Sequence, residues 1–554
     1  MATFTGNSVV HKKSSRFQEW VYDYLKNNTV AGCAYYVTDR VSYKERIAWL
    51  SVHFILVILV IFTIGEATFE FMDSPTVTTV ETTTYPIQNV YFPGVAICDL
   101  NKISYGAAME IAEEIVNSNL FGNFTVTEVF DMLKYLGHLY LFELDESETY
   151  DVMLLHKILL RRYGPYVAHI IERLSPSCRQ MMKNCFWGSI ERPCEDIFFT
   201  RPTGEGLCCV FNHDRRTEDS QSQIYENDVP TTGKVETSRA IGSWNGLTVV
   251  VDPQISDNYY KMHPTSGFKV LIFSSFDFPD ASSGGLTEVL VSPHTVTSMH
   301  LQATTFYSVP QVVDYDILKR ECLFGHELSR KFQGYYSYSD CIMYCRIDDI
   351  ENFCHCVPVF YPHPRNSQTD RPCDLRDLPC LRKFRNRWWR MKPRIDESAT
   401  QFYYRDLGLM NETDGALNCE QCYPACADVS YKVSVSAASL TSSKMVIGKT
   451  VDKFDDHSII SVYFKEPGTV RLKQDVLFYW YELMSNYGGI CGFFLGVSLL
   501  SVVELFYFCT LRLYRWKGIT SKEEKKSQFI FVKAAKPSLQ PLYWKEMIQP
   551  NIRY

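Results

Sequence analysis

The 18 residues Ile47–Ile64 read IAWLSVHFILVILVIFTI and carry no Asp, Glu, Lys or Arg. An apolar helix of this length is long enough to cross the hydrocarbon core of a bilayer. A secretory signal peptide is the alternative, but 46 residues precede the stretch, and no small-residue cleavage site follows it before acidic and aromatic sequence begins. We therefore expect a first transmembrane helix at residues 47–64.

A second apolar stretch covers residues 483–511 and has Glu504 as its one charged residue. As a straight helix its 29 residues would be roughly 43 Å long, which is more than the bilayer core requires. We expect a second transmembrane segment there that is either tilted or broken.

Charge is distributed unevenly around these two stretches. The net charge is +3 for residues 1–46, +7 for residues 512–554 and −17 for the residues between them, within a total of −7. Basic residues accumulate on the cytoplasmic side of membrane spans. The sequence therefore predicts a plasma-membrane protein with both ends in the cytosol and an extracellular domain at residues 65–482. So acidic a chain is not suited to nucleic acid, which requires a basic face.

Cysteines and glycosylation sequons agree with this topology. Sixteen of the 19 cysteines, an even number, fall between residues 65 and 482, where an oxidising compartment would let them form disulfides. The other three are Cys33, Cys491 and Cys509. The sequons at Asn123 and Asn411 lie in the same range, whereas the sequon-like Asn27–Thr29 is in the cytosolic segment, where we expect no glycosylation.

The extracellular range has a mixed α and β pattern. Residues Val90–Cys98 alternate and are rich in β-branched side chains, which predicts a strand, and residues 246–310 predict several more. Apolar residues at helical spacing predict helices at 107–120 and 128–136. The fold class we expect is a two-span membrane protein with a large α+β, disulfide-rich extracellular domain.

Two cysteine motifs within this domain admit different chemistry. On one helix, Cys341 and Cys345 would lie four residues apart on the same face and bond to one neighbouring element. The pair Cys354 and Cys356, with His363 nearby, is compatible with zinc instead. Zinc sites use reduced thiolates at regular CxxC spacing, whereas an extracellular compartment favours oxidation. We expect disulfides and no metal.

No catalytic motif accompanies these features. The chain has no GxxxxGK[ST] phosphate loop, no HExxH and no GxSxG nucleophile elbow, so we do not expect an enzyme. The basic, aromatic stretch Arg382–Arg394 is compatible with an arginine-rich binding segment. A solvated helix whose basic stems shield its tryptophans is the simpler interpretation.

The second apolar stretch carries the functional signal. Gly488, Gly492 and Gly496 recur every four residues, which clears one helical face for packing against another helix. Packing does not account for Ser498 and Glu504, because a carboxylate inside a membrane is costly unless it faces water or a partner. If several copies surrounded an axis, backbone carbonyls and the Ser498 hydroxyl would form a narrow point with a ring of Glu504 below it. Both features favour cations.

Five segments along the chain form an ordered series. They are Phe92–Cys98 (FPGVAIC), Gly206–Asn212 (GLCCVFN), the cysteine pattern from Tyr336 to Pro362, Gly496–Ser498 and Glu504–Phe506. Together they resemble the motifs of the epithelial sodium channel and degenerin family, most closely its insect pickpocket branch, from the first span to the second. The resemblance implies a trimeric, Na+-conducting channel with a hand-shaped extracellular domain, usually blocked by amiloride. No cofactor is expected.

The resemblance assigns roles to single residues. Residues 496–498 correspond to the G-x-S selectivity filter, with Val497 in place of the common Ala or Ser. Ser485 occupies the degenerin position just outside the filter, where only small side chains avoid holding the channel open, and Asn486 stands where an Asp is frequent. The cytosolic His-Gly pair of the family, which affects opening, is Ala31-Gly32 here, with the glycine kept.

The resemblance also implies how the cysteines pair. The implied pairs are Cys98 with Cys208, Cys185 with Cys194, Cys322 with Cys426, Cys341 with Cys422, Cys345 with Cys419, Cys354 with Cys380, and Cys356 with Cys373. Cys178 and Cys209 are left over and are paired by elimination.

Several functions are consistent with the sequence. The leading hypothesis is a cation-selective subunit in a homotrimer or heterotrimer of related chains, gated through its extracellular domain by a stimulus that the sequence does not identify. A non-conducting auxiliary subunit fits the loss of the histidine at Ala31. A two-span scavenger or lipid-binding receptor would share the topology, but it does not need three glycines, a serine and a carboxylate in one membrane helix. A purinergic-type channel would require a Lys-rich phosphate pocket, which we do not find.

Overall fold

The chain is described here by a computed structural model. It describes residues 16–38, 41–118, 124–165, 167–214, 235–328, 336–362, 371–391, 415–440, 444–447, 450–453 and 457–512. The two predicted glycosylation sites, Asn123 and Asn411, lie outside these residues, as does most of the basic tail. The chain divides into two compact units: Met1–Asp73 with Phe478–Tyr554, here called the helical unit, and Ser74–Leu477, here called the disulfide unit.

The helical unit contains both apolar stretches. Its elements are α1 (Arg16–Asn27), the 3-10 helix η1 (Cys33–Tyr36), α2 (Tyr43–Asp73), α15 (Trp480–Leu495), α16 (Leu499–Tyr507) and the π-helix η11 (Phe508–Arg512). At 31 residues, α2 extends beyond the predicted first span at both ends. It is the one helix among the described residues that is long and apolar enough to cross a membrane by itself. The pair α15 and α16 qualifies only as one bent segment.

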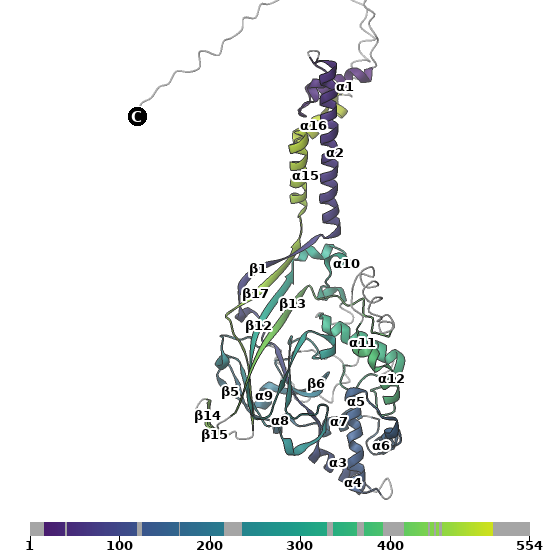
Figure 1. The fold of residues 1–554 in the computed structure, drawn as a ribbon, viewed down its shortest axis with the longest axis vertical. Helices are drawn as coiled ribbons and strands as arrows, with labels where there is room; N and C mark the ends of the chain where they lie inside the picture. The colour runs from purple at the N-terminus through teal and green to yellow at the C-terminus, as the bar shows by residue number, and fades with distance from the viewer. Residues whose placement is uncertain are drawn as a thin grey trace, which may run out of the picture. The chain divides into compact units, whose positions relative to one another are not determined.

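Helices α2 and α15 run side by side in the helical unit (Figure 1). The hydroxyl groups of Thr68 on α2 and Tyr487 on α15 lie 2.7 Å apart and share a hydrogen bond. The Thr68 hydroxyl also donates to the Ile64 carbonyl of its own helix at 2.6 Å, so the Tyr487 hydroxyl is the donor to Thr68, and the contact joins α2 to α15 at a defined pair of positions.

The disulfide unit is built on two larger sheets. The first has the order β1-β17-β12-β16-β8-β4-β5, with β13 paired to the long strand β12, and the second has the order β11-β10-β2-β7-β6. The strands of the first sheet are β1 (Thr76–Pro86), β4 (Met182–Trp187), β5 (Ile190–Arg192), β8 (Leu247–Val251), β12 (Thr295–Ser308), β13 (Ala427–Ser439), β16 (Ser458–Phe464) and β17 (Gly468–Val476). Those of the second are β2 (Gly94–Asp99), β6 (Phe198–Thr203), β7 (Gly206–Phe211), β10 (Phe268–Phe273) and β11 (Leu286–Val291). Two small pairs remain, namely β3 (Asn101–Ser104) with β9 (Asn258–Lys261) and β14 (Lys444–Ile447) with β15 (Thr450–Lys453).

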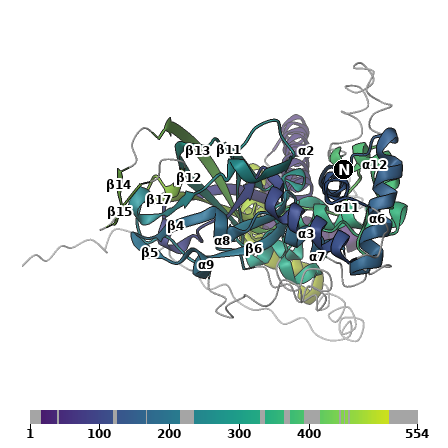
Figure 2. The ribbon, with the colours of Figure 1, turned by 90° about the horizontal axis from the view of Figure 1, so that it is seen from below.

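Helices α3, α6, α7, α11 and α12 of the same unit lie to one side, apart from β4, β5 and β13, whereas α8 and α9 lie beside β4 and β6 (Figure 2). The helices are α3 (Tyr105–Asn117), α4 (Val126–Leu133), α5 (His138–Leu141), α6 (Thr149–Tyr163), α7 (Val167–Leu174), α8 (Cys178–Met181), α9 (Cys194–Ile197), α10 (Ile317–Arg320), α11 (Tyr338–Cys354) and α12 (Leu378–Trp389). The helices predicted at 107–120 and 128–136 are α3 and α4, each beginning and ending a few residues earlier than predicted. Caps set these starts: Ser104 caps α3, and Thr125 with Glu128 forms a capping box on α4.

Burial explains which segments became strands. Every residue of β2, β8 and β10 is buried, which matches their almost continuous apolar sequence. The predicted strand at Val90–Cys98 is correct only in its second half, because Val90 and Phe92 join the main core while the backbone between them forms only an isolated bridge, from Tyr91 to Thr237. The strands predicted within residues 246–310 are β8 to β12.

Eight disulfides cross-link the disulfide unit. They join Cys98 to Cys208, Cys178 to Cys209, Cys185 to Cys194, Cys322 to Cys426, Cys341 to Cys422, Cys345 to Cys419, Cys354 to Cys380 and Cys356 to Cys373. These are the same eight pairs that were expected. Cys341 and Cys345 do lie on one helix, α11, and bond to consecutive cysteines of the segment before β13. The bridges therefore tie α11 to the end of the domain, over sequence separations of 81 and 74 residues.

Candidate functional site

The main feature of the helical unit is a break in the second apolar stretch. Helix α15 ends at Leu495, α16 begins at Leu499, and the two axes are bent by 79°. Of the two alternatives expected from its length, the segment is thus broken. The break coincides with Gly496–Ser498, the three residues that resemble a selectivity filter.

Gly496 makes the break possible. Its φ of 64° lies in the left-handed region that favours glycine, and its N–H donates to the carbonyl of Gly492 at 3.0 Å, which closes the last turn of α15. A side chain here would also meet a neighbour, because a Cβ built on Gly496 lies 2.9 Å from the Cβ of Ala31. The left-handed backbone and the short distance to the Ala31 methyl group both disfavour a side chain at this position.

Ser498 begins the second half of the segment as the N-cap of α16. Its hydroxyl accepts the N–H of Ser501 at 3.3 Å, and the Ser501 hydroxyl accepts the N–H of Ser498 at 3.2 Å. This reciprocal pair satisfies two of the four N–H groups that a helix start leaves free. The break therefore carries its own polar partners, which a break inside a membrane requires.

The segment that precedes α2 packs against this break. Thr29 lies beside α16, where its hydroxyl is 2.8 Å from that of Ser501 and donates to Oε2 of Glu504 at 2.9 Å. The Thr29 N–H donates to the same oxygen at 3.1 Å. The one carboxylate of the second apolar stretch is therefore engaged by residues from the other end of the chain, and Ala31 follows two residues later against Gly496.

The remaining predicted pore residues lie along α15. Ser485, Asn486 and Gly488 are exposed within the single chain. A Cβ added at Gly488 would meet no atom within 4 Å, so this glycine does not serve packing between α15 and α2. The face is free for neighbours outside the chain.

Gly32 has the most crowded surroundings of the predicted gating residues. Its φ is 84°, and a Cβ built on it lies 2.6 Å from Cε1 of His53 on α2. Sequence reasoning gave no role to His53 or Thr29. Thr29 was noted only as the third residue of a sequon-like triplet, and its contact with Glu504 joins positions 475 residues apart. No periodicity or spacing could have indicated that contact.

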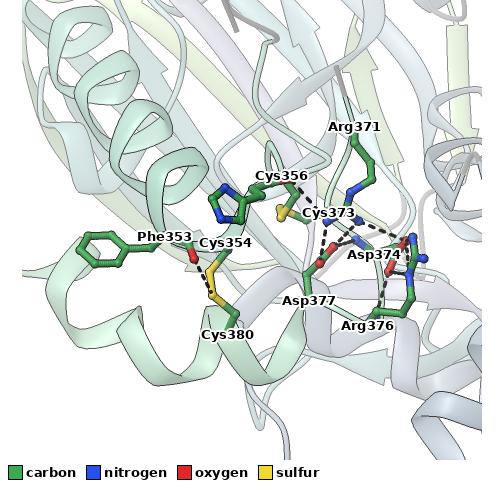
Figure 3. Close-up of a disulfide and its surroundings, with 10 residues drawn as sticks. Phe353, Cys354, Cys356, Arg371, Cys373, Asp374, Arg376, Asp377 and Cys380 are labelled. Atoms are coloured by element: carbon green, nitrogen blue, oxygen red, sulfur yellow. Dashed lines mark hydrogen bonds and ion pairs between the residues drawn. A yellow bond between two sulfur atoms is a disulfide. The ribbon is translucent and has the colours of Figure 1, made fainter. Parts of the chain in front are cut away.

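In the disulfide unit, the zinc alternative of Cys354, Cys356 and His363 is not supported. Cys354 is bonded to Cys380, and His363 lies outside the described residues. Cys356 and Cys373 lie near Asp377 in a group with metal-like spacing, but the two sulfur atoms are bonded to each other (Figure 3). Arg371 pairs with Asp377 through two contacts of 2.8 Å. The sulfurs thus cannot act as thiolates, and the carboxylate is already neutralised.

The basic stretch has the structure of a solvated helix. Its described part, Arg382–Met391, forms most of α12, in which Trp388 is buried. Arg387 pairs with Asp349 at 2.8 Å and Arg385 with Glu143 at 2.8 Å, so two of its cations already have acidic partners. Residues from 392 onward lie outside the described range.

A cluster of acidic groups is buried where α11 begins. Asp277 and Asp340 are each about 95% buried, and the Ser339 hydroxyl donates to Oδ2 of Asp277 at 3.1 Å. Among the described residues, no group donates to the other oxygen of Asp277. Burial, followed by the nearby carboxyls of Asp340 and Asp428, raises the pKa of Asp277 to about 8. The raised pKa favours the protonated form of this carboxyl.

Strand β17, which precedes α15 in the chain, is fixed to β1 and β12 by one arginine. The guanidinium of Arg471 lies 4.6 Å from the ring centre of Tyr85 and 4.2 Å from that of Tyr307. It also contacts Glu81 at 3.2 Å, and Glu81 in turn accepts the Tyr307 hydroxyl at 2.9 Å. These cation–π contacts and the ion pair add to the backbone pairing of β17 with β1 and with β12.

Comparison with known proteins identifies similar sequences among sodium channels. A family model described as amiloride-sensitive sodium channel matches residues 24–508. The chain is 26% identical over 531 residues to the sodium channel protein Nach of Drosophila melanogaster, covering 92% of each chain. It is 24% identical over 525 residues to pickpocket protein 28 of the same species, covering 89% of this chain and 78% of that one. It is 22% identical over 378 residues to the epithelial sodium channel subunit beta of Xenopus laevis, covering 63% and 51%.

Proposed function

The chain belongs to the amiloride-sensitive sodium channel family, the epithelial sodium channel and degenerin group, and we propose that it is a pore-forming subunit whose ions pass the break at Gly496–Ser498. Members of this family are plasma-membrane ion channels, not enzymes, and they assemble as oligomers of related subunits. We further propose that this chain assembles as a trimer, is selective for Na+, is blocked by amiloride and has a sensory role.

The observation that carries the proposal is the capped break in the second apolar stretch. A continuous helix satisfies its own backbone and presents only side chains, whereas a break frees carbonyl groups to face a water-filled path. In this proposal Gly496 and Val497 supply carbonyl oxygens for a partly dehydrated cation, and the Ser498 hydroxyl adds a further ligand. Ser485 and Asn486 would lie outside this constriction, with Gly488 and Gly492 on the pore-facing side of α15.

The proposed topology keeps the predicted boundaries. Residues 1–46 and 512–554 are cytosolic, residues 47–64 and 483–511 cross the membrane, and residues 65–482 are extracellular, with glycans at Asn123 and Asn411. The disulfide unit would receive the stimulus. Its strand β1 follows the first span in the chain and β17 precedes the second, and the two pair directly from Thr76 with Val476 onward. Because the two strands are hydrogen-bonded, a movement of one strand would also move the other.

The test is expression in oocytes under voltage clamp, alone and with related subunits. We expect an inward Na+ current that amiloride blocks. Replacing Ser485 by Cys and attaching a bulky thiol reagent should hold the channel open, whereas Ser485→Ala should behave like the wild type. The unmutated chain with the same reagent controls for Cys491, which lies on the same helix.

Two outcomes would distinguish the alternatives. Current that appears only when a related subunit is present, and that does not respond to the modified Ser485→Cys in this chain, would assign the chain an auxiliary role, which fits the loss of the histidine at Ala31. Surface oligomers that remain silent in every combination, with or without the modified Ser485→Cys, would contradict the proposal.

A further inference from the structure

His53 is the one strongly polar side chain in the middle of the first apolar stretch. An imidazole in a membrane helix is costly unless it has hydrogen-bond partners within the protein. In α2 its Nε2 lies 2.8 Å from the carbonyl oxygen of Ala31, and its Nδ1 lies 3.2 Å from that of Trp49 in the preceding turn. Both partners are carbonyl oxygens, which only accept, and the shorter contact places an N–H on Nε2 that donates to Ala31.

The ring is also enclosed on its sides. Tyr36 of η1 packs edge to face against it at 5.4 Å between ring centres, and Trp49 lies 6.3 Å away. Gly32 faces its edge at a distance that only a glycine permits, because any Cβ would lie 2.6 Å from Cε1. The imidazole therefore occupies the space that a side chain on residue 32 would need.

The opposite side of the same turn reaches the break. The turn comprises Val30–Gly32 and is closed by the Cys33 N–H donating to the Val30 carbonyl at 3.4 Å. Its Ala31 methyl fills the space beside Gly496, where a built Cβ would be 2.9 Å away. Ala31 therefore contacts the α2 imidazole through its carbonyl oxygen and lies beside the end of α15 through its methyl group.

We propose that His53 is a positioning residue that fastens the Val30–Gly32 turn to α2 and so holds Ala31 against the helix break at Gly496. The docking itself is a property of the helical unit. Its consequence, a fixed width of the ion path at residues 496–498 and hence a fixed ion selectivity, rests on the proposed function.

Cys33 provides a readout of docking that does not depend on conduction. It follows the turn directly, is half-buried, and burial raises the pKa of its thiol, which slows reaction with maleimide. In a Cys491→Ser, Cys509→Ser background the other cysteines are all in disulfides, so Cys33 is the remaining thiol. Its modification rate is measured in native membranes by mass spectrometry.

Two variants separate the hydrogen bond from the shape of the ring. His53→Phe keeps an aromatic ring against Tyr36 but removes both nitrogens, whereas His53→Gln keeps an N–H that can reach the Ala31 carbonyl. We expect Cys33 to react about fivefold faster in His53→Phe, which corresponds to the loss of one net hydrogen bond, and at close to the wild-type rate in His53→Gln. Thr63→Val is the control, because the Thr63 hydroxyl donates within its own helix to Leu59 at 2.9 Å, and its loss should leave Cys33 unchanged.

In conducting assemblies the same variants are compared by the Na+ to K+ permeability ratio. His53→Phe should change this ratio and His53→Gln should restore it. Equal Cys33 rates in the wild type and in His53→Phe would overturn the docking role, as would failure of His53→Gln to slow the reaction. Altered Cys33 rates with an unchanged permeability ratio would overturn the link to selectivity. A chain that never conducts contradicts the proposed function alone, and the thiol readout still decides the docking.

Discussion

The hydroxyl group of Thr29 donates a hydrogen bond to Oε2 of Glu504 at 2.9 Å, although the two residues are 475 positions apart in the chain. The same carboxylate oxygen accepts the backbone N–H of Thr29. The one carboxylate of the second apolar stretch is therefore held by a residue near the opposite end of the polypeptide. Whatever moves the segment before α2 also moves the charge at the inner end of the proposed ion path.

The Thr29 to Glu504 contact predicts energetic coupling between the two residues. Hydrogen bonds to a charged group contribute about 1.5–3 kcal/mol, so Thr29→Val and Glu504→Gln should be non-additive by about 1–2 kcal/mol in the open–closed equilibrium. The measurement is a double-mutant cycle on single-channel open probability. Thr29→Ser, which keeps the hydroxyl, is the matched control. Additivity to within about 0.3 kcal/mol would show that the contact does not matter for gating.

Gly496 should tolerate no side chain. Gly496→Ala places a methyl group on a residue with φ of 64° and 2.9 Å from the Cβ of Ala31, so we expect current to be lost while surface expression persists. Adding Ala31→Gly removes the clash but not the backbone strain and should restore current only in part. Gly489→Ala on α15 is the control, since a Cβ there meets nothing within 4 Å and alanine favours the helix. Full current in Gly496→Ala would refute the assignment of the break.

Asp277 predicts how the stability of the disulfide unit depends on pH. Its pKa is raised to about 8 in the folded protein and is about 3.9 in an unfolded chain, so between these values the folded state binds the extra proton. Stability from this group is therefore present at acidic pH and is lost as pH rises toward 8. The melting temperature between pH 5 and pH 8 should fall less steeply in Asp277→Asn than in the wild type.

Two neighbours refine this pH experiment. Asp340→Asn removes a nearby negative charge and so lowers the pKa of Asp277, which narrows the pH range over which Asp277 makes stability fall. The amide oxygen of the new residue can still accept the Phe278 N–H. Burial raises the pKa of Asp99 to about 7, so Asp99 also makes the melting temperature fall as pH rises. This part of the pH dependence should remain in Asp277→Asn. Identical pH profiles in the wild type and Asp277→Asn would mean that Asp277 is ionised in the folded protein.

Arg471 should stabilise the β1–β17–β12 contact through its planar guanidinium. Arg471→Lys keeps the charge but cannot stack between Tyr85 and Tyr307, so we expect a loss of about 1–2 kcal/mol and a melting temperature lower by about 2 °C. Tyr307→Phe keeps the ring and removes only the hydroxyl that donates to Glu81, so its effect should be smaller. The thermal stability of the full-length protein, followed by size-exclusion fluorescence, tests both. An effect in Tyr307→Phe equal to that in Arg471→Lys would assign the stabilisation to the hydroxyl and not to stacking.

Sequence reasoning was most successful where one local property decides structure. The charge-free run of α2, the β-branched and mostly apolar strands β8 and β10, and the four-residue spacing of Cys341 and Cys345 each impose a conformation or a face on their own segment. It was less accurate at element ends, as with the strand predicted from Val90, because tertiary packing decides where a ladder begins. The length of the second apolar stretch required tilting or breaking, but only the αL conformation of Gly496 and its contact with Ala31 fixed the choice.

The sequence by itself determined that the chain has two apolar segments around an acidic, cysteine-rich domain, because length, charge and composition act locally and need no partner. The tertiary structure alone decided that Thr29 holds Glu504 and that the imidazole of His53 occupies the space left by Gly32. Those contacts join residues distant in the chain, and their energy arises only when folding brings a donor to within hydrogen-bond distance of its acceptor. No pattern along the sequence records that distance.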